Sequence, residues 1–401
     1  MLTPQQIEVI KATVPVLQRH GVALIAHFYQ RMLTNQPELK NIFNQTHQAT
    51  GHQQKALAMA VLAYAQNIEN PSVLAGALRH IAVKHCTVGI RAEHYPIVGR
   101  HLLASIQEVL GEACTPAILD AWGAAYQQLA DVLIQMEQRV YTEQATQEGG
   151  WSGWRPFRVV GRRDLSADVT EFSLMPSDGG AVSKFTPGQF ISIRSYIPSK
   201  GYQQPRQYTL SHAYDPARNL LTIAVKKVTS QEFPNGVMSH HVHDTFTEGT
   251  IVDVSAPTGD FTIDPKADSP LVLIAAGIGI TPIKAMVQAL SLENPGRSVS
   301  VYLVRKNSSY FPYAEEIRRR IAMMSNARLA VFFTQPKEDD HLGRDFDVQG
   351  RLEVTTMTID PEATYYICGP EAFMLETRDA LTAKGIPATQ VHVELFGTGS
   401  L

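Results

Sequence analysis

One histidine in the N-terminal third of the chain has the setting of a metal ligand. His85 lies in a helical stretch and shares a face with Leu78 and Ile81, at spacings of three and four residues. An imidazole on an apolar face points into the protein, where it either binds a metal through a ring nitrogen or remains a core histidine held by hydrogen bonds. Taken alone, this setting is more typical of a core histidine than of a ligand, so the interpretation of His85 depends on the residues around it.

A glycine-rich turn in the C-terminal third could hold the phosphates of a dinucleotide. The segment 276–282 follows an apolar, strand-like run and precedes a helical one. The N-terminus of a helix after such a turn presents backbone N–H groups to anionic phosphates. The third glycine of the GxGxxG fingerprint is missing, so this turn taken alone is not specific for a dinucleotide.

The stretch 206–211 has the residue types that a flavin dinucleotide requires. The guanidinium fork of Arg206 suits pyrophosphate oxygens, and the ring of Tyr208 suits the isoalloxazine face. Thr209 offers a hydroxyl and backbone groups for the edge of the flavin ring. Gln207, between Arg206 and Tyr208, belongs to the same candidate site. The stretch resembles the RxY[ST] motif of the ferredoxin-reductase-like flavoproteins, which implies that FAD binds here.

Two further segments of the central region resemble the same flavoproteins. The segment 187–190 resembles their PGQ-aromatic element, which implies that Phe190 packs near the adenine of FAD. The segment 235–239 resembles their glycine–serine turn, which implies that Gly236 and Ser239 meet the pyrophosphate. Each segment alone has the composition of an ordinary turn, but the elements occur in the order typical of these flavoproteins.

The nicotinamide-binding elements of these flavoproteins are matched near the C-terminus. The turn at 276–282 resembles their GxGxTP element, whose residues here are Gly277, Gly279, Thr281 and Pro282. A second element resembles their CGP turn and consists of Cys368, Gly369 and Pro370. The resemblance places this cysteine near the position of hydride transfer, and a small buried side chain is the alternative. Glu394 and Phe396 lie in a segment that resembles the terminal E-x-F-G, whose aromatic ring shields the flavin.

The sequence pattern divides the chain into three domains and a linker. Residues 1–140 show apolar positions at helical spacing, in successive segments without strand-like alternation. Glycine, serine and tryptophan over 141–153 indicate a linker that packs against the protein. Short β-rich runs over 154–264 predict an antiparallel β-barrel or sandwich, of which the flavoprotein resemblance implies the barrel. Alternating strands and helices over 268–401 predict a parallel α/β sheet. The predicted fold is therefore multidomain, with an all-α domain first.

Composition excludes several other classes of function. The chain has 401 residues, a net charge of −3 and 18% charged residues, so charge gives no support to a nucleic-acid or acidic-membrane partner. Its three cysteines form no zinc or disulfide pattern, as expected in a reducing cytoplasm. We find no signal peptide and no transmembrane segment. We expect a cytoplasmic protein, and the near-neutral charge is compatible with a monomer.

The N-terminal domain resembles the globin domain of the bacterial flavohaemoglobins. Pro37 and Phe43 have the spacing of the bend that precedes the haem-packing phenylalanine in this family. Tyr29, on the second helical segment, and Gln53 fall where the family has its distal tyrosine and glutamine. Leu57, one turn after Gln53, falls where a side chain faces the haem. The resemblance implies that the domain binds haem b.

The same resemblance makes His85 the proximal ligand of the haem iron. Tyr95 and Glu137 fall where the family has residues that hydrogen-bond around this histidine. A carboxylate on the second ring nitrogen makes the imidazole a stronger electron donor, which suits redox chemistry on bound oxygen better than oxygen storage. A solvated carboxylate is the alternative for Glu137. Lys84 falls where the family places a lysine on the flavin side, with a solvated lysine as the alternative.

Because the resemblance covers the whole chain, it implies a nitric oxide dioxygenase. NAD(P)H would reduce FAD, FAD would reduce haem, and haem would convert nitric oxide and oxygen to nitrate. NADH and NADPH both remain open, because Arg305 and Lys306 could hold a 2′-phosphate or lie in solvent. Two alternative functions are an oxygen or nitric oxide sensor, which does not need Glu137, and a general NAD(P)H flavin reductase, which does not need His85.

Overall fold

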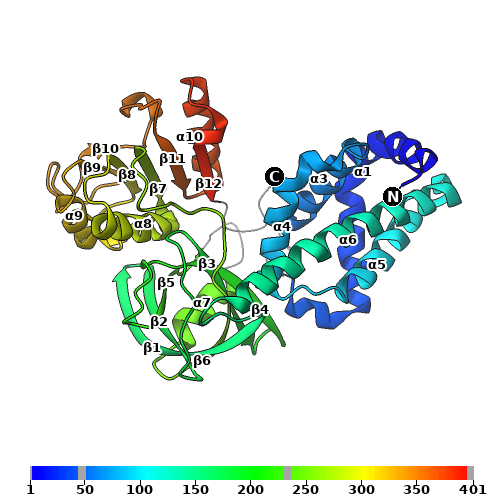
Figure 1. Ribbon diagram of the computed structural model, residues 1–401, viewed down its shortest axis with the longest axis horizontal. Coiled ribbons are helices and arrows are strands. Elements are labelled where there is room, and N and C mark those ends of the chain that lie inside the picture. The colour runs from blue at the N-terminus through cyan, green and yellow to red at the C-terminus, as the bar shows by residue number, and fades with distance from the viewer. Residues whose placement is uncertain (1, 44–50, 230–235, 395–401) are drawn as a thin grey trace. The chain divides into compact units, whose positions relative to one another are not determined.

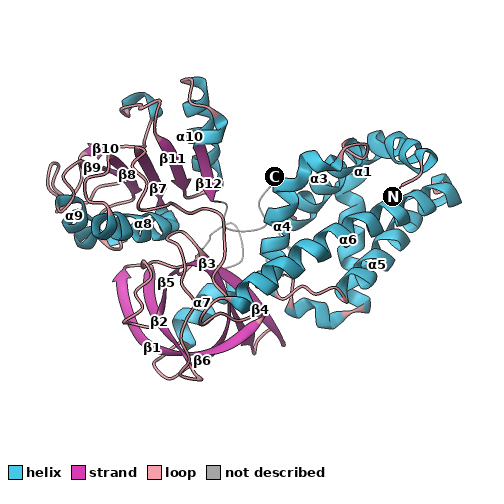
Figure 2. Ribbon diagram, in the orientation of Figure 1, coloured by secondary structure: helices cyan, strands magenta, loops and turns pink. Residues whose placement is uncertain are grey.

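The computed structural model describes residues 2–43, 51–229 and 236–394, which form two compact units. The first unit contains the chain as far as Trp154 together with the segment Ser192–Arg206. The second unit contains Arg155–Ile191 and the described residues from Gln207 onward. The first unit is mostly helical, and the second holds most of two β-sheets (Figure 1, Figure 2).

Helices form nearly all of the described residues before Trp154, as the sequence predicts. The α-helices are α1 (Pro4–Asn35), α3 (His52–Gln66), α4 (Ala75–Val88), α5 (His94–Leu110) and α6 (Pro116–Thr146). The 3-10 helices are η1 (Pro37–Asn41), η2 (Pro71–Leu74) and η3 (Gly111–Ala113). Thr3 caps α1, since its hydroxyl accepts a hydrogen bond from the backbone N–H of Gln6. Across the described residues, no helix is both long and apolar enough to cross a membrane.

Two boundaries differ from the sequence prediction. The first and second helical segments form one continuous helix, α1, which passes through Gly21 without a break. Gly21 is buried inside the helix, and a methyl group there would make an ordinary contact of 3.7 Å with the Cβ of Ala58 on α3, so this glycine does not mark a turn. The linker begins later than residue 141, because α6 continues to Thr146. Trp151 is buried, in agreement with a packed linker.

The central region contains the predicted antiparallel sheet, in the order β4-β3-β6-β1-β2-β5. Its strands are β1 (Trp154–Ser166), β2 (Val169–Pro176), β3 (Phe190–Ile197), β4 (Tyr202–Thr209), β5 (Leu221–Lys226) and β6 (Ile251–Ser255). The helix α7 (Val237–Thr245) lies between β5 and β6 in the chain. An antiparallel bridge between Leu210 and Ile223 connects the end of β4 to β5. Because β4 and β5 are the edge strands, this bridge curls the sheet toward a barrel.

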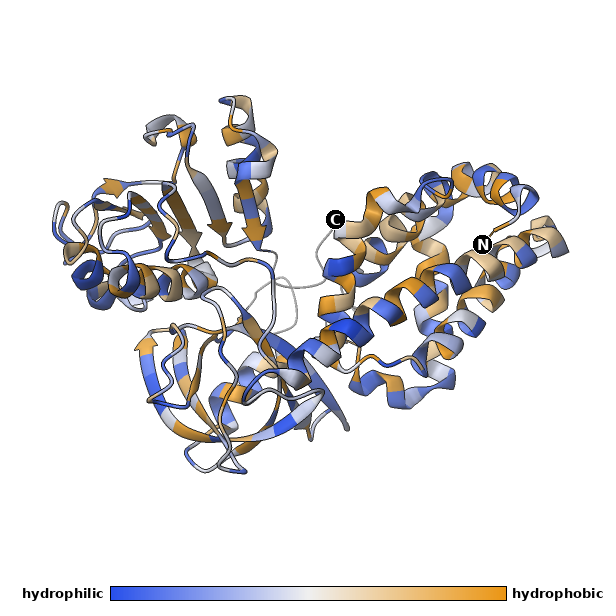
Figure 3. Ribbon diagram, viewed as in Figure 1, coloured by the Kyte–Doolittle hydropathy of each residue, from blue (hydrophilic) through white to orange (hydrophobic). Residues whose placement is uncertain are grey.

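The last region is the predicted parallel sheet, in the order β10-β9-β8-β7-β11-β12. Its strands are β7 (Leu271–Ala276), β8 (Val299–Arg305), β9 (Ala327–Phe333), β10 (Val348–Gln349), β11 (Thr364–Cys368) and β12 (Val391–Glu394). Its helices are α8 (Ile280–Glu293), α9 (Ala314–Ala322) and α10 (Glu371–Ala383). In Figure 3 the central strands are largely hydrophobic and α9 is mostly hydrophilic.

Alternate residues of each central strand pack into opposite layers of this sheet. Leu271 and Leu273 of β7 join the cluster that contains residues of α8 and α9, whereas Val272 and Ile274 join the cluster that contains residues of α10. Both faces of the sheet are therefore covered by helices. The strand order reverses between β7 and β11, because the chain passes from β7 outward to β10 and then returns to β11 on the other side. In open α/β sheets, ligands bind at such a reversal, beyond the carboxyl ends of the strands.

Candidate active site

The residues predicted around the proximal histidine meet in one hydrogen-bonded cluster. His85 on α4 places its Nδ1 atom 2.8 Å from Oε1 of Glu137 on α6 and 3.2 Å from the hydroxyl of Tyr95 on α5. The Tyr95 hydroxyl donates to the same Oε1 atom at 2.5 Å. Glu137 is only 2% exposed, and a buried carboxylate requires such donors. Three helices therefore converge on one carboxylate oxygen.

This cluster prepares His85 to bind a metal through its other ring nitrogen. Because a carboxylate oxygen of Glu137 can only accept, a hydrogen bond at Nδ1 of His85 requires the proton on Nδ1 and leaves Nε2 as the nitrogen that can bind a metal. Burial and the hydrogen bond to Glu137 raise the pKa of Tyr95, so the phenol stays protonated and remains a donor. The His85 side chain is 33% exposed, while Ala82 and Cys86 on the same helix are buried. An anchored imidazole with one exposed edge is what a haem iron requires.

The predicted distal residues form a polar pair in apolar surroundings. The side chains of Tyr29 on α1 and Gln53 on α3 are hydrogen-bonded to each other, and burial raises the pKa of Tyr29. The ring of Phe43 lies edge-on to that of Tyr29, with 5.7 Å between the ring centres. Phe43 and Leu57 both pack against the core that contains Tyr29. Lys84 is half-buried beside His85. A buried phenol and an amide of this kind suit a small polar ligand.

The flavin motif occupies consecutive positions at the end of β4. Because side chains alternate along a strand, Arg206 and Tyr208 share one face, and Gln207 and Thr209 share the other. Thr209 is buried, and the other three are half-buried. Nη1 of Arg206 donates to the carbonyl of Pro205 at 2.7 Å, which directs part of the guanidinium back to the backbone. Arg206 and Tyr208 thus lie on the same face of β4, which suits a ligand that has both a pyrophosphate and a flavin ring.

The glycine–serine turn leads directly into α7. Oγ of Ser239 accepts from the N–H of Val228 at 3.1 Å and donates to the carbonyl of Gly236 at 2.9 Å. A side chain on Gly236 would bring its Cβ within 2.7 Å of this hydroxyl, so the turn favours glycine. The helix start leaves backbone N–H groups for an anion. Phe190 is buried at the start of β3, and Asn235 lies outside the described residues.

The dinucleotide turn lies at the reversal of the parallel sheet, between the carboxyl ends of β7 and β11. Gly277 has a left-handed backbone (φ 53°), and no atom lies within 4 Å of the position of a Cβ there. A Cβ on Gly279 would overlap the carbonyl of Cys368. Thr281 is buried, its hydroxyl donates to the carbonyl of Ile278 at 3.1 Å, and Pro282 follows in α8. The turn therefore packs against β11 and leaves Gly277 open to a ligand.

Arg305 does not lie in solvent, which was one of the two positions considered for it. It is 3% exposed at the end of β8, and its Nη1 atom donates to the carbonyl of Gly277. Burial lowers the pKa of Arg305 to about 9. Lys306 is exposed, with its Nζ atom 5.0 Å from the centre of the Tyr310 ring. Arg305 thus stabilises the dinucleotide turn through its hydrogen bond to the backbone of Gly277.

The second predicted nucleotide element follows β11. Cys368 is fully buried, and its Sγ atom lies 3.9 Å from the carbonyl of Glu394 on β12. Burial raises the pKa of this thiol well above its usual value, so it behaves as a small apolar side chain. Gly369 packs against Ala276, and Pro370 is the N-cap residue that precedes α10. Phe396 lies outside the described residues.

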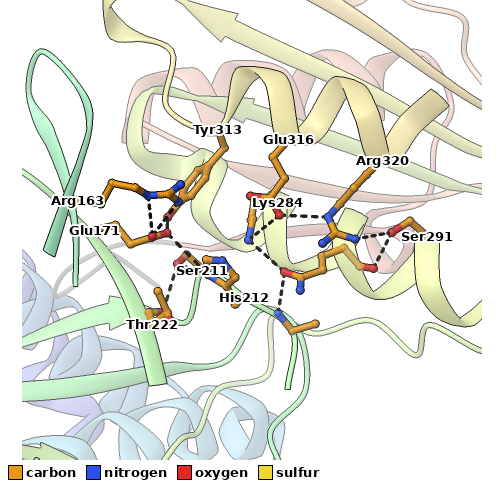
Figure 4. Close-up of polar contacts among 12 residues, drawn as sticks. Arg163, Glu171, Ser211, His212, Thr222, Lys284, Ser291, Tyr313, Glu316 and Arg320 are labelled. Atoms are coloured by element: carbon orange, nitrogen blue, oxygen red, sulfur yellow. Dashed lines mark hydrogen bonds and ion pairs between the residues drawn. The ribbon is translucent and has the colours of Figure 1, made fainter. Parts of the chain in front are cut away.

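A buried polar network in the second unit was not predicted from the sequence (Figure 4). Lys284 on α8 is fully buried, and its Nζ atom lies 3.2 Å from Oε1 of Glu316 on α9. Glu171 on β2 accepts a hydrogen bond of 2.7 Å from the hydroxyl of Tyr313. A lysine inside the otherwise apolar start of α8 was the one signal in the sequence, but its partners lie far away along the chain.

Comparison with protein families assigns all three regions. Residues 26–133 match the family described as Globin. Residues 156–263 match the Oxidoreductase FAD-binding domain, and residues 273–379 match the Oxidoreductase NAD-binding domain. These matches agree with the helical domain, the antiparallel sheet and the parallel sheet.

Similar proteins contain the three domains in one chain. The chain is 46% identical to the Flavohemoprotein of Bordetella pertussis over 404 residues, covering 100% of both chains. It is 45% identical to the Flavohemoprotein of Chromobacterium violaceum, covering 99% of each. The crystal structure of flavohemoglobin from Malassezia yamatoensis with bound FAD and heme superposes with a TM-score of 0.87 at 32% identity, covering 99% of this chain and 100% of that one. The chain therefore belongs to the flavohemoprotein family and is an oxidoreductase whose cofactors are haem, FAD and a nicotinamide dinucleotide.

Proposed function

We propose that this protein is a nitric oxide dioxygenase, which uses NAD(P)H and oxygen to convert nitric oxide to nitrate. When bound, FAD turns a hydride into single electrons, and haem supplies the iron at which the gases react. The observation that carries the proposal is the hydrogen bond of 2.8 Å between His85 and the buried Glu137. A carboxylate on the second ring nitrogen strengthens an imidazole as a donor to iron, which redox chemistry needs and storage does not.

The distal residues support a gas as the substrate. The hydroxyl of Tyr29 and the amide of Gln53 would donate hydrogen bonds to a small polar ligand on the iron, while Phe43 and Leu57 exclude water. His85 would bind the iron through Nε2. Lys84, half-buried beside it, matches the lysine that the family has near the flavin and would add positive charge for electron transfer to the haem.

The reductase residues would hold the two dinucleotides. Arg206 and the turn around Gly236 would bind the FAD pyrophosphate, and Tyr208 would pack on the flavin ring. The turn of Gly277 and Gly279 would receive the NAD(P)H phosphates. A solved structure of the FAD/NAD-binding domain of nitric oxide dioxygenase from Vibrio cholerae supports this function, with 32% identity and a TM-score of 0.55 over 61% of this chain and 98% of that one. We further propose that the protein works in the cytoplasm as a monomer.

The test is to measure NAD(P)H consumption under oxygen before and after nitric oxide is added, with nitrate as the product measured. The purified protein should show haem and flavin absorbance, and nitric oxide should sharply accelerate consumption with formation of nitrate. Haem and flavin without a response to nitric oxide would indicate a sensor or a general flavin reductase instead. The comparison of NADH with NADPH in the same assay decides the coenzyme.

A further inference from the structure

Lys284 is a fully buried lysine close to the dinucleotide turn. It lies on the first turns of α8, which begins directly after Gly279. Its Nζ atom is 3.2 Å from Oε1 of Glu316 and 3.0 Å from Oε1 of Gln288. The same atom lies 5.1 Å from the centre of the Tyr313 ring. A buried ammonium is unfavourable unless it is paired and hydrogen-bonded, and these contacts offset that cost.

Gln288 connects this lysine to the segment that follows the flavin motif. Its Oε1 atom accepts one hydrogen bond from Lys284 and a second, of 3.3 Å, from the backbone N–H of Ala213. Ala213 lies only two residues after Ser211, the last residue of the stretch that begins at Arg206. One atom, Oε1 of Gln288, therefore accepts hydrogen bonds both from Lys284 and from the backbone just after the flavin motif.

A second connection runs from Lys284 through Tyr313 to the antiparallel sheet (Figure 4). Tyr313 is the N-cap residue of α9 and has a left-handed backbone (φ 63°), and its hydroxyl donates to Oε2 of Glu171 at 2.7 Å. Glu171 is buried on β2, where Arg163 donates to its other oxygen at 2.8 Å. Lys284 thus lies where α8, α9 and the flavin-binding sheet meet.

We propose that Lys284 is a positioning residue for hydride transfer, which holds the dinucleotide turn of α8 in register with the flavin-binding segment. In this step a hydride, with its two electrons, leaves the nicotinamide ring for the flavin, and NAD(P)+ remains. The reacting atoms must approach to about 3–3.5 Å, and a misplacement of about 1 Å can slow such a step by about 10²-fold. The inference rests on the NAD(P)H-to-FAD step of the proposed function and not on nitric oxide chemistry.

The charges around Lys284 give this role a pH dependence. The groups that face it are Glu316 and Arg320 on α9, Glu171 on β2, His212 and Tyr313. Burial lowers the pKa of Lys284 to about 8, against the attraction of Glu316. Burial also lowers the pKa of His212 to about 3, so this histidine stays neutral at physiological pH. Lys284 is therefore the group of this network that loses its charge as the pH rises through about 8, which weakens its pairing with Glu316.

Lys284→Met tests the proposal without leaving a buried charge unpaired. Glu316 keeps its second partner, because Nε of Arg320 lies 3.1 Å from the same Oε1 atom. Methionine is apolar and of similar length, so FAD content and the thermal midpoint should stay the same or rise. We expect the rate constant of flavin reduction at saturating NAD(P)H, measured by anaerobic stopped-flow at pH 7, to fall about tenfold. Lys384→Met, at an exposed position after α10, is the matched control and should reduce at the wild-type rate.

The pH profile separates positioning from a merely structural role. The wild-type rate constant should fall as the pH rises through about 8, whereas that of Lys284→Met should be low and flat. A wild-type rate in Lys284→Met at every pH would overturn the proposal, and so would a slow rate accompanied by an equal loss of FAD or of thermal stability. Normal flavin reduction without nitric oxide consumption would overturn the proposed function alone. Failure of both NADH and NADPH to reduce the wild-type flavin would overturn both.

Discussion

The negative charge of Glu137 is the residue-scale feature on which the proposed chemistry depends most. Glu137→Gln keeps the size of the side chain but weakens the hydrogen bond from His85, because a neutral amide is a poorer acceptor than a carboxylate. Loss of such a partner behind a metal ligand costs about 10–100-fold in activity, and we expect nitrate formation to slow to that extent. The iron–histidine stretching frequency of the ferrous protein should fall in resonance Raman spectra. Glu143→Gln, at an exposed position on the same helix, should leave this frequency unchanged.

Tyr29 offers a second prediction at the residue scale. Tyr29→Phe removes the hydroxyl that meets Gln53 but keeps the ring that packs on Phe43. If this hydroxyl donates to oxygen on the iron, its loss removes roughly 1–1.5 kcal/mol, so oxygen should dissociate about tenfold faster in flash-photolysis experiments. Tyr64→Phe is the control, because the buried Tyr64 hydroxyl donates to the carbonyl of Ala125 at 3.3 Å. Equal dissociation rates for Tyr29→Phe and the wild type would argue against a distal role.

At the scale of elements, the close packing of the β7–α8 turn on β11 should make Gly279 intolerant of any side chain. A Cβ there would overlap the backbone carbonyl of Cys368, which cannot move without shifting the strand. We expect Gly279→Ala to lower the free energy of unfolding by about 3 kcal/mol, at the upper end of overpacking effects, and to weaken NAD(P)H binding. Gly296→Ala meets only one atom, at 3.9 Å, and should change stability by less than about 0.5 kcal/mol. Calorimetric unfolding of both variants checks this difference.

The contact between α8 and α9 carries a pH-dependent stability that can be predicted with its sign. The pKa of Lys284 is lowered from 10.5 in the unfolded chain to about 8 in the fold, so the unfolded chain binds the proton more tightly. The charged lysine therefore destabilises the fold fully below pH 8, and this cost disappears as the pH rises toward 10.5. Relative to Lys284→Met, the wild type should gain up to roughly 3 kcal/mol between these limits. Thermal unfolding at pH 7 and pH 10 measures the change, and a constant difference would contradict it.

Elements whose signals are local could be predicted from the sequence, and those that depend on distant partners could not. The strand runs of β7, β8 and β11 were predicted because their apolar residues and flanking turns are contiguous in the chain. The continuity of α1 was not predicted, because the apolar spacing indicates two helical segments and does not reveal that both belong to one helix. The strand β6 has a weaker local signal, since it has only five residues and an exposed Ile251 at its start. The network around Lys284 combines residues from four distant segments, which no local pattern reveals.

At the scale of the whole molecule, the family places a haem domain and a flavin reductase in one chain, so a single substitution should separate their activities. His85→Ala removes the proposed iron ligand while the FAD and NAD(P)H elements lie elsewhere in the sequence. Flavin reduction by NAD(P)H should therefore keep its wild-type rate constant in anaerobic stopped-flow experiments. Nitric oxide-dependent NAD(P)H consumption should fall by at least about 100-fold, because iron without its axial ligand no longer accepts electrons for the gas reaction.

The outcome for His85→Ala distinguishes the three functions considered for the chain. A dioxygenase loses nitrate formation and keeps flavin reduction. A general flavin reductase keeps its turnover with small electron acceptors and shows no nitric oxide-dependent activity in the wild type either. A sensor loses gas binding, but its wild type shows little NAD(P)H oxidation when both gases are present. Retention of nitrate formation in a His85→Ala protein that still contains haem would show that another residue binds the iron, and the proximal role of the His85, Tyr95 and Glu137 cluster would then be wrong.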